Sequence, residues 1–197
     1  MPKLDFWYEF ASTYSYLAAM RIGKLAQAAG VEVMWRPFLL GPIFKAQGWE
    51  TSPFLLQEAK GKYMWRDLAR LCADAGLPPF RQPKNFPARS LLAARVALAL
   101  DDAARPDFSR AVYVAGFADG KDIAEAETGA AILRALGHNP AAVLACANGQ
   151  SVKDRLRENT EEAQQRGLFG APSFVLANGE MFWGNDRLEQ ALAWAKR

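Results

Sequence analysis

The chain has 197 residues, of which 51% are hydrophobic, 23% charged and 12% aromatic, and its formal net charge at pH 7 is +3. A chain of this length buries about 70% of the surface that it exposes when unfolded, so a substantial core is expected. The small charge, without a basic stripe, argues against a nucleic-acid partner, and the lack of a long apolar run argues against a membrane span.

The first predicted elements form a strand, a helix and a second strand. Residues 4–10 are rich in aromatic side chains and predict a buried strand. Residues 14–30 carry apolar residues at helical spacing and end at a glycine, and residues 31–38 predict the next strand. A helix between two strands is typical of a βαβ unit with a parallel pair.

A helical block follows, in which proline and glycine signals separate the segments. Helices are predicted at 57–75, 88–100, 107–116, 129–135, 141–148 and 150–166. Strands at 173–176 and 180–183 then flank Asn178-Gly179, which is a hairpin turn signal. A last helix is predicted at 186–196, with Asn185 as its N-cap.

The order βαβ, helices, ββα predicts an α/β protein with a thioredoxin-like fold interrupted by a large all-helical insertion. Residues 1–42 and 168–197 would form the thioredoxin-like domain, and residues 43–167 the insertion. The N-terminal residues lack the features of a secretory signal, which predicts a cytoplasmic protein. Cys72 and Cys146 form no C-x-x-C pair and are interpreted as small buried hydrophobes. The single His138 predicts neither a metal site nor a serine-hydrolase triad.

The stretch FASTYSYLA places Ser12 and Ser15 where a thioredoxin-like redox protein would carry Cys-x-x-Cys. Hydroxyls cannot perform disulfide exchange, which needs a thiolate. A hydroxyl at the positive end of a helix can, however, donate a hydrogen bond to a thiolate that a ligand brings. Ser12 is the candidate for this role, and the alternative is that it is simply the N-cap of the helix.

Two further segments suit a ligand. A cis bond before Pro172 would expose the backbone of Ala171 for pairing with a short peptide, whereas an ordinary trans proline would only begin a strand. The segment FWGNDR offers backbone N–H groups and the carboxylate of Asp186 to a ligand with a carboxylate and an ammonium. The alternative for Asp186 is a first-turn acid that stabilises the helix dipole.

These pieces in this order resemble the DsbA-like glutathione enzymes that comprise 2-hydroxychromene-2-carboxylate isomerases and kappa-class glutathione transferases. The resemblance covers essentially the whole chain, through DFWYEFASTYSYLA, RPFLLGPIFKAQG, KGKYMWRDLARL, FPARSLLAARVAL, GLFGAPSFVL and MFWGNDRL. The isomerase branch is the closer match. The family implies glutathione as cofactor, a small aromatic 2-oxo acid as substrate and a homodimer.

The resemblance also implies roles for individual residues. Ser12 matches the serine that hydrogen-bonds the glutathione sulfur. The remaining glutathione contacts would come from Thr13, Tyr14, Lys60, Ala171, Pro172, Asn185 and Asp186. Lys45 and Phe86 would contact the substrate, with Lys45 facing its carboxylate.

Two departures from the family pattern stand out. Thr13 replaces the proline of S-P-Y-S, which loosens the turn without removing a polar contact. An asparagine expected after FKAQG is missing, and the acidic Glu50 in that region would repel the carboxylates of glutathione.

The resulting hypothesis is a glutathione-dependent cis–trans isomerase of hydroxychromene-carboxylate and benzylidenepyruvate-type acids. The alternatives are a kappa-like transferase and a glutathione- or peptide-binding protein without turnover.

Overall fold

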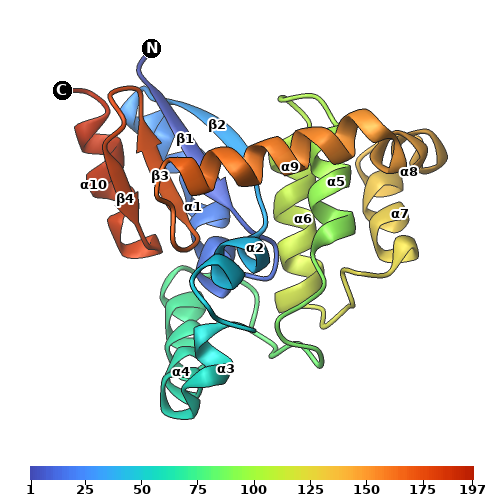
Figure 1. Ribbon diagram of the computed structural model, residues 1–197, viewed down its shortest axis with the longest axis horizontal. Coiled ribbons are helices and arrows are strands. Elements are labelled where there is room, and N and C mark those ends of the chain that lie inside the picture. Colours follow the sequence, from blue (N-terminus) through green and yellow to red (C-terminus); the bar gives the residue numbers. More distant parts are fainter.

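Both ends of the chain build one sheet. The computed structural model describes residues 1–197, and its four strands are β1 (Lys3–Tyr8), β2 (Glu32–Pro37), β3 (Ser173–Leu176) and β4 (Met181–Trp183). Their order is β2-β1-β3-β4; β1 is parallel to β2, and β3 is antiparallel to β1 and to β4 (Figure 1). The two central strands therefore come from opposite ends of the chain.

Helix α1 (Thr13–Ala29) is the crossover between β1 and β2. It ends at Gly30, whose φ of 68° is left-handed and whose N–H caps the carbonyls of Ala26 and Gln27. A side chain here would be strained, so the glycine fixes where the chain turns into β2. The βαβ prediction is confirmed.

Alternating side chains of β1 face two apolar clusters. Phe6 and Tyr8 lie in the larger cluster, with α1 and the C-terminal helix, whereas Trp7 lies in a smaller cluster on the other face. Phe6 stacks on Phe174 with 5.6 Å between ring centroids and meets Trp35 edge to face at 4.9 Å. These aromatic contacts join the strands and add to the stability that burial provides.

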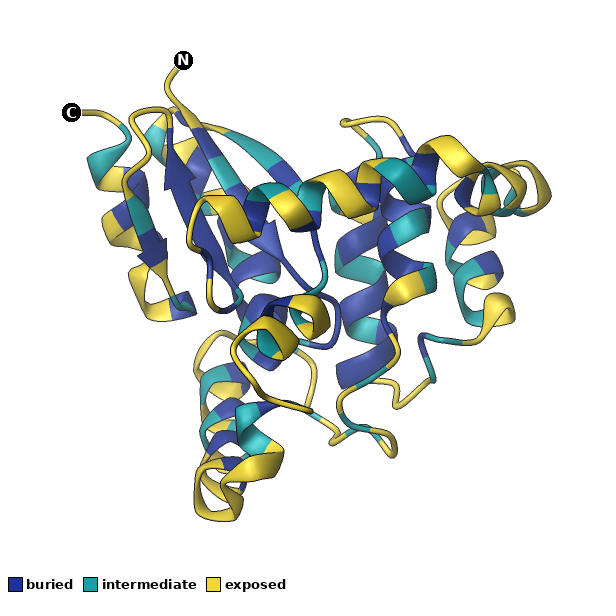
Figure 2. Cartoon of the chain, viewed as in Figure 1, coloured by how far each residue is buried: buried dark blue, intermediate teal, exposed yellow.

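Eight helices lie between β2 and β3 in the sequence. They are α2 (Leu40–Ala46), α3 (Pro53–Leu56), α4 (Glu58–Asp74), α5 (Leu91–Ala99), α6 (Arg105–Phe117), α7 (Ala126–Ala135), α8 (Pro140–Asn148) and α9 (Gln150–Gln165). Six of them were predicted; α2 and α3 were not. Figure 2 shows that α5 and α6 are largely buried, whereas the projecting pair α3 and α4 is mostly exposed on its outer side. The thioredoxin-like fold with a helical insertion is therefore confirmed. The domain boundaries stay a prediction, and the bond between residues 42 and 43 lies inside α2.

The C-terminal part differs in one respect from the prediction. The hairpin around Asn178-Gly179 is present, but Asn185 is not the N-cap of a single helix. A short 3-10 helix, η1 (Asn185–Arg187), precedes α10 (Leu188–Trp194). The cap position of η1 is Gly184, with φ at 108°, and the Asn185 carboxamide oxygen accepts a hydrogen bond from Arg21 instead of from the helix.

Candidate functional site

Ser12 lies at the N-terminus of α1, where the sheet brings it next to the loop before β3. Its hydroxyl oxygen accepts a hydrogen bond from the Ser15 backbone N–H at 3.2 Å, so Ser12 is the N-cap of the helix. The same hydroxyl donates to the carbonyl oxygen of Ala171 at 2.9 Å. Ser12 therefore serves as a cap and still directs its hydrogen toward the opposite segment.

The Ala171–Pro172 bond is cis, which is one of the two alternatives that the sequence left open. Ala171 is half-buried, and its N–H finds no acceptor within the chain. A buried or partly buried N–H group normally has a partner, so this donor is available to a ligand. The Ala171 N–H is therefore a free donor near the positive end of the α1 dipole, and the Ser12 hydroxyl becomes a second donor only when its hydrogen turns away from the Ala171 carbonyl.

The next two residues of α1 contact α4. The buried Thr13 hydroxyl donates to the sulfur of Met64 at 3.2 Å, so the side chain of Thr13 is not available to a ligand. The Tyr14 hydroxyl donates to Asp67 at 3.0 Å. Burial and this bond to Asp67, followed by the charge of Asp186, raise the pKa of Tyr14, so its phenol stays protonated.

Asn185 is held by a residue of α1. Arg21 donates from Nη1 to the Asn185 carboxamide oxygen at 2.9 Å and also forms an ion pair with Glu189. Because the oxygen is occupied, the amide nitrogen of Asn185 is left as a donor. Asp186 is exposed and touches Arg187 at 2.9 Å, so its carboxylate can reach a ligand ammonium.

The predicted substrate residues lie on other elements. Lys45 is exposed in the last turn of α2, Lys60 is exposed on α4, and neither forms an ion pair within the chain. Both are therefore free to meet a carboxylate. Phe86 is half-buried and meets Trp65 of α4 edge to face at 4.7 Å. The contacts predicted for these three residues stay predictions.

The sequence analysis did not single out Glu9, which lies directly beneath the loop of Ser12. Glu9 is 5% exposed; its carboxylate accepts from Ser90 Oγ and, at 2.9 Å, from the Ala11 N–H. Its backbone carbonyl accepts from the Ser12 N–H and from the Tyr113 hydroxyl. Burial raises the pKa of Glu9 to about 7. The only sequence signal was an acid within the aromatic run DFWYEF.

Arg21 and Asp67 also escaped the sequence analysis. Each acts on a site residue that is far away in the chain, Arg21 on Asn185 and Asp67 on Tyr14. Arg21 belongs to no motif, and Asp67 lies within KGKYMWRDLARL, but the sequence does not show that either residue pairs with its distant partner.

The two cysteines differ in exposure, which corrects the common interpretation of both as buried. Cys72 on α4 is buried, and this raises the pKa of its thiol to about 11, whereas Cys146 on α8 is exposed. The buried residue of α8 is Ala147, which belongs to the larger apolar cluster, whereas its neighbour Cys146 faces away from that cluster. Neither cysteine lies near Ser12 in sequence, and both are unpaired.

Comparisons with known proteins agree over nearly the full length. A family model described as a DSBA-like thioredoxin domain matches residues 3–193. A 2-hydroxychromene-2-carboxylate isomerase of Pseudomonas sp. (strain C18) is 30% identical, with 94% of this chain and 86% of that protein covered. Glutathione s-transferase kappa 2 of Caenorhabditis elegans is 28% identical, with 95% and 88% covered. A solved structure of a 2-hydroxychromene-2-carboxylate isomerase superposes with a TM-score of 0.89 at 27% identity, with 99% of this chain and 95% of that chain covered.

Proposed function

The chain belongs to the DsbA-like thioredoxin domain family, and from this premise we propose that it is a glutathione-dependent cis–trans isomerase of aromatic 2-oxo acids. Homologues named 2-hydroxychromene-2-carboxylate isomerase match it over more than nine-tenths of its length. The observation that carries the proposal is the Ser12 hydroxyl at the N-terminus of α1, set against the Ala171 carbonyl. The proposed substrates are acids of the 2-hydroxychromene-2-carboxylate and hydroxybenzylidenepyruvate type.

The residues present fit glutathione. A tripeptide needs backbone partners for its middle residue, and the unpaired N–H of Ala171 supplies one. Its γ-glutamyl end carries both an ammonium and a carboxylate, which the Asp186 carboxylate and the Asn185 amide donor complement. Lys60 can meet a further carboxylate, since no acid within the chain engages it.

In the proposed mechanism Ser12 stabilises a thiolate. Bound glutathione supplies a sulfur that can add to a conjugated double bond and leave again, which permits rotation while the bond is single. To help, Ser12 turns its hydrogen from Ala171 toward the sulfur while its oxygen keeps the bond from Ser15 N–H. The positive end of α1 favours the same charge. Lys45 orients the substrate carboxylate, and Phe86 contacts its ring.

A kappa-like transferase is the second candidate, favoured by the match to the kappa-class protein over 95% of this chain. The same thiolate site would serve either reaction. In the isomerase the glutathione adduct breaks down again to free glutathione, whereas in the transferase it is the product.

A cytoplasmic location is part of the proposal, because reduced glutathione and unpaired cysteines both belong to a reducing compartment.

The deciding experiment mixes the protein with reduced glutathione and hydroxybenzylidenepyruvate and follows the substrate absorbance. Catalytic conversion to the isomer, dependent on glutathione and without a stable adduct, supports the isomerase. An accumulating glutathione conjugate supports the transferase. Glutathione binding without turnover of either kind overturns both and leaves a binding protein. Insulin reduction would contradict the site itself, because Ser12 and Ser15 carry no sulfur.

A further inference from the structure

Glu9 is a buried acid without an ionic partner, and the proposed mechanism gives it no step. Burial raises the pKa of its carboxyl, and no neighbouring cation counteracts this. Burying a carboxyl costs free energy of folding that its hydrogen bonds offset only in part. Stability alone therefore does not account for an acid at this position, and its contacts indicate what else it does.

Two hydrogen bonds join Glu9 to the residues that lead into α1. Its Oε2 accepts from the Ala11 N–H at 2.9 Å, and its backbone carbonyl accepts from the Ser12 N–H, also at 2.9 Å. The two peptide groups on either side of Ala11 are thereby both fixed by one residue. The rotamers open to a side chain depend on its backbone, so these bonds also restrict where the Ser12 hydroxyl can point.

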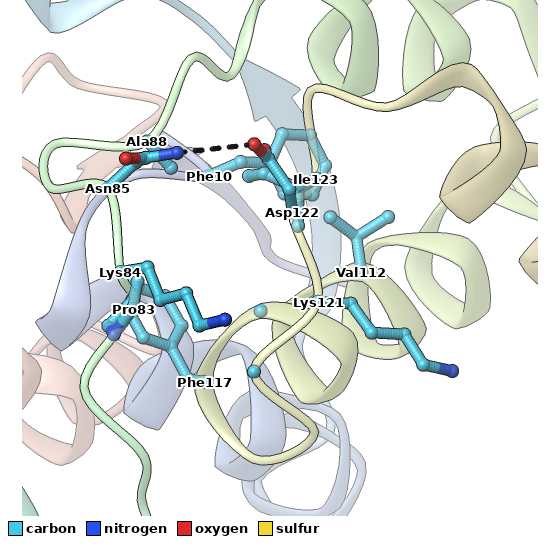
Figure 3. Close-up of a pocket in the computed structure, with 12 residues that line it drawn as sticks. Phe10, Pro83, Lys84, Asn85, Ala88, Val112, Phe117, Lys121, Asp122 and Ile123 are labelled. Atoms are coloured by element: carbon cyan, nitrogen blue, oxygen red, sulfur yellow. Dashed lines mark hydrogen bonds between the residues drawn. The ribbon is translucent and has the colours of Figure 1, made fainter.

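Apolar packing alone restrains this turn less tightly. Phe10, between Glu9 and Ala11 in the chain, is buried and meets the Tyr113 ring with 5.2 Å between centroids. Phe10 also lines a cavity of about 240 Å³ beside α6, together with Val112 and Phe117 (Figure 3). A side chain that borders a cavity makes fewer van der Waals contacts than one enclosed on every side. The hydrogen bonds of Glu9 therefore supply restraint that the packing of Phe10 does not.

Glu9 is itself held from the helical part of the chain. Ser90, directly before α5, donates from its Oγ to the Glu9 carboxyl. The hydroxyl of Tyr113 on α6 donates to the Glu9 backbone carbonyl at 3.0 Å. Both of these residues are buried. Glu9 is thus fixed by α5 and α6 on one side and fixes the approach to α1 on the other.

We propose that Glu9 is a positioning residue of the thiolate site: through the N–H groups of Ala11 and Ser12 it holds the Ser12 hydroxyl where it can donate to the glutathione sulfur. This inference rests on the proposed function and deepens it. Hydrogen bonds weaken steeply when their angle departs from linearity, so a loosened Ser12 stabilises a thiolate less well. Glu9 acts only through Ser12, because Ala11 and Ser90 engage its own carboxyl oxygens.

The test measures the thiolate-to-thiol ratio of bound glutathione on the full chain at pH 6, by ultraviolet difference absorbance. At this pH the Glu9 carboxyl is mostly protonated, because its pKa is about 7. Glu9→Gln reproduces that state, since its oxygen can accept from Ala11 and its amide can donate to Ser90. Glu9→Met keeps the length of the side chain without either bond, and Ser90→Ala removes only the outer one.

Tyr8→Phe is the matched control. It removes a buried hydrogen bond between β1 and α6, which joins the hydroxyls of Tyr8 and Ser109 at 2.8 Å, and leaves those of Glu9 in place. S-methylglutathione is the second probe. It has the same peptide but no ionisable thiol, so calorimetric titration with it reports binding without thiolate formation.

We expect the ratio to fall about tenfold in Glu9→Met and about threefold in Ser90→Ala, as the loss of one or two positioning hydrogen bonds implies. Glu9→Gln and Tyr8→Phe should stay within about twofold of wild type, and so should the affinity of every variant for S-methylglutathione. In a Ser12→Ala background, neither Glu9→Met nor Ser90→Ala should lower the ratio further.

The result that overturns this inference alone is a ratio that falls in Ser12→Ala but not in Glu9→Met or, if that variant does not fold, not in Ser90→Ala. A loss that persists undiminished in the Ser12→Ala background, or that weaker binding of S-methylglutathione matches, also overturns it, because Glu9 would then be only a structural residue. An unchanged ratio in Ser12→Ala overturns the thiolate role of Ser12, on which the proposed function and this inference both rest.

Discussion

The Ser12 hydroxyl donates a 2.9 Å hydrogen bond to the Ala171 carbonyl oxygen and joins two segments that are 159 residues apart in the sequence. A serine hydroxyl has one hydrogen and two lone pairs. Ser12 uses one lone pair for the Ser15 N–H and its hydrogen for Ala171. Any role toward a ligand sulfur therefore requires the hydrogen to leave Ala171, while the cap can stay.

Ser12→Ala and Ser12→Gly should differ in their free energy of unfolding but not in their effect on the thiolate of bound glutathione. Both remove the hydroxyl, so the thiolate fraction of bound glutathione should fall about tenfold to a hundredfold in each, the worth of one hydrogen bond to a charged group. Alanine also removes the cap and should cost about 1 kcal/mol of unfolding free energy, whereas glycine costs only about a few tenths. Ultraviolet difference absorbance and urea unfolding measure the two effects. A full thiolate signal in Ser12→Gly would show that the hydroxyl does not stabilise the sulfur.

Glu9→Gln should change how stability depends on pH. The pKa of Glu9 is raised from 4.5 to about 7 in the folded protein, so folding favours its protonated form. Between these two pH values the buried carboxylate becomes progressively costly, and the wild type should lose about 3 kcal/mol relative to Glu9→Gln as the pH rises. Below pH 4.5 the difference should be constant. Urea unfolding at pH 4.5 and pH 8 gives the comparison.

Glutamine keeps an oxygen for the Ala11 N–H and an amide for Ser90, so the variant should fold. If the two proteins show parallel stability curves between pH 4.5 and pH 8, the burial of Glu9 does not couple to its ionisation.

Arg21→Gln should weaken glutathione binding. Arg21 fixes the carboxamide of Asn185, and losing a charged hydrogen bond of this kind typically weakens an interaction about tenfold or more. Glu189→Gln is the matched control, because it removes only the exposed partner of the same arginine and should change affinity less than about twofold. Calorimetric titration with glutathione distinguishes them. Equal losses in both variants would mean that the ion pair, and not the bond to Asn185, matters.

Tyr14→Phe should destabilise the contact between α1 and α4. The Tyr14 hydroxyl donates to the half-buried Asp67, and removing it should cost about 1–2 kcal/mol, although Arg70 still pairs with Asp67. Tyr63→Phe, on the exposed side of α4, makes the same chemical change without that bond and should cost almost nothing. Urea unfolding of the two variants tests this; equal effects would contradict it.

Thr13→Pro should stabilise the protein by about 0.5 kcal/mol. Thr13 is the first residue of α1, a position where proline fits and lowers the entropy of the unfolded chain. Thr13→Ala controls for the lost contact to Met64, since both variants remove it. The unfolding free energy of the proline variant should therefore exceed that of the alanine variant. A less stable proline variant would indicate that the loop at Ser12 cannot accept the ring.

The sequence predicted the sheet and most helices because their signals are local. An aromatic run, a glycine after α1 and Asn178-Gly179 each mark an element by themselves. Helices α2 and α3 were missed because Gly41-Pro42 and Pro53 look like breakers. They lie in first turns, where a proline has no hydrogen bond to lose.

The candidate site was predictable only where residues sit in motifs. Ser12, Ala171 and Asn185 belong to recognisable short stretches. Arg21, Asp67 and Glu9 act through partners from other elements, and Glu9 depends on Ser90 in the helical part for one of its hydrogen bonds. Such contacts follow from tertiary packing, which a single sequence does not display.

The position of β1 between β2 and β3 also sets the order in which the protein can mature. During synthesis from the N-terminus, β1, α1 and β2 leave the ribosome first, but the other neighbour of β1 is made only after α9. Until then the edge of β1 that pairs with β3 has no partner strand, and the Ala171 carbonyl that accepts the hydrogen bond from Ser12 has not yet been made. The nascent chain therefore carries an open sheet edge for most of its translation, and the ligand site comes into being only with the last strands.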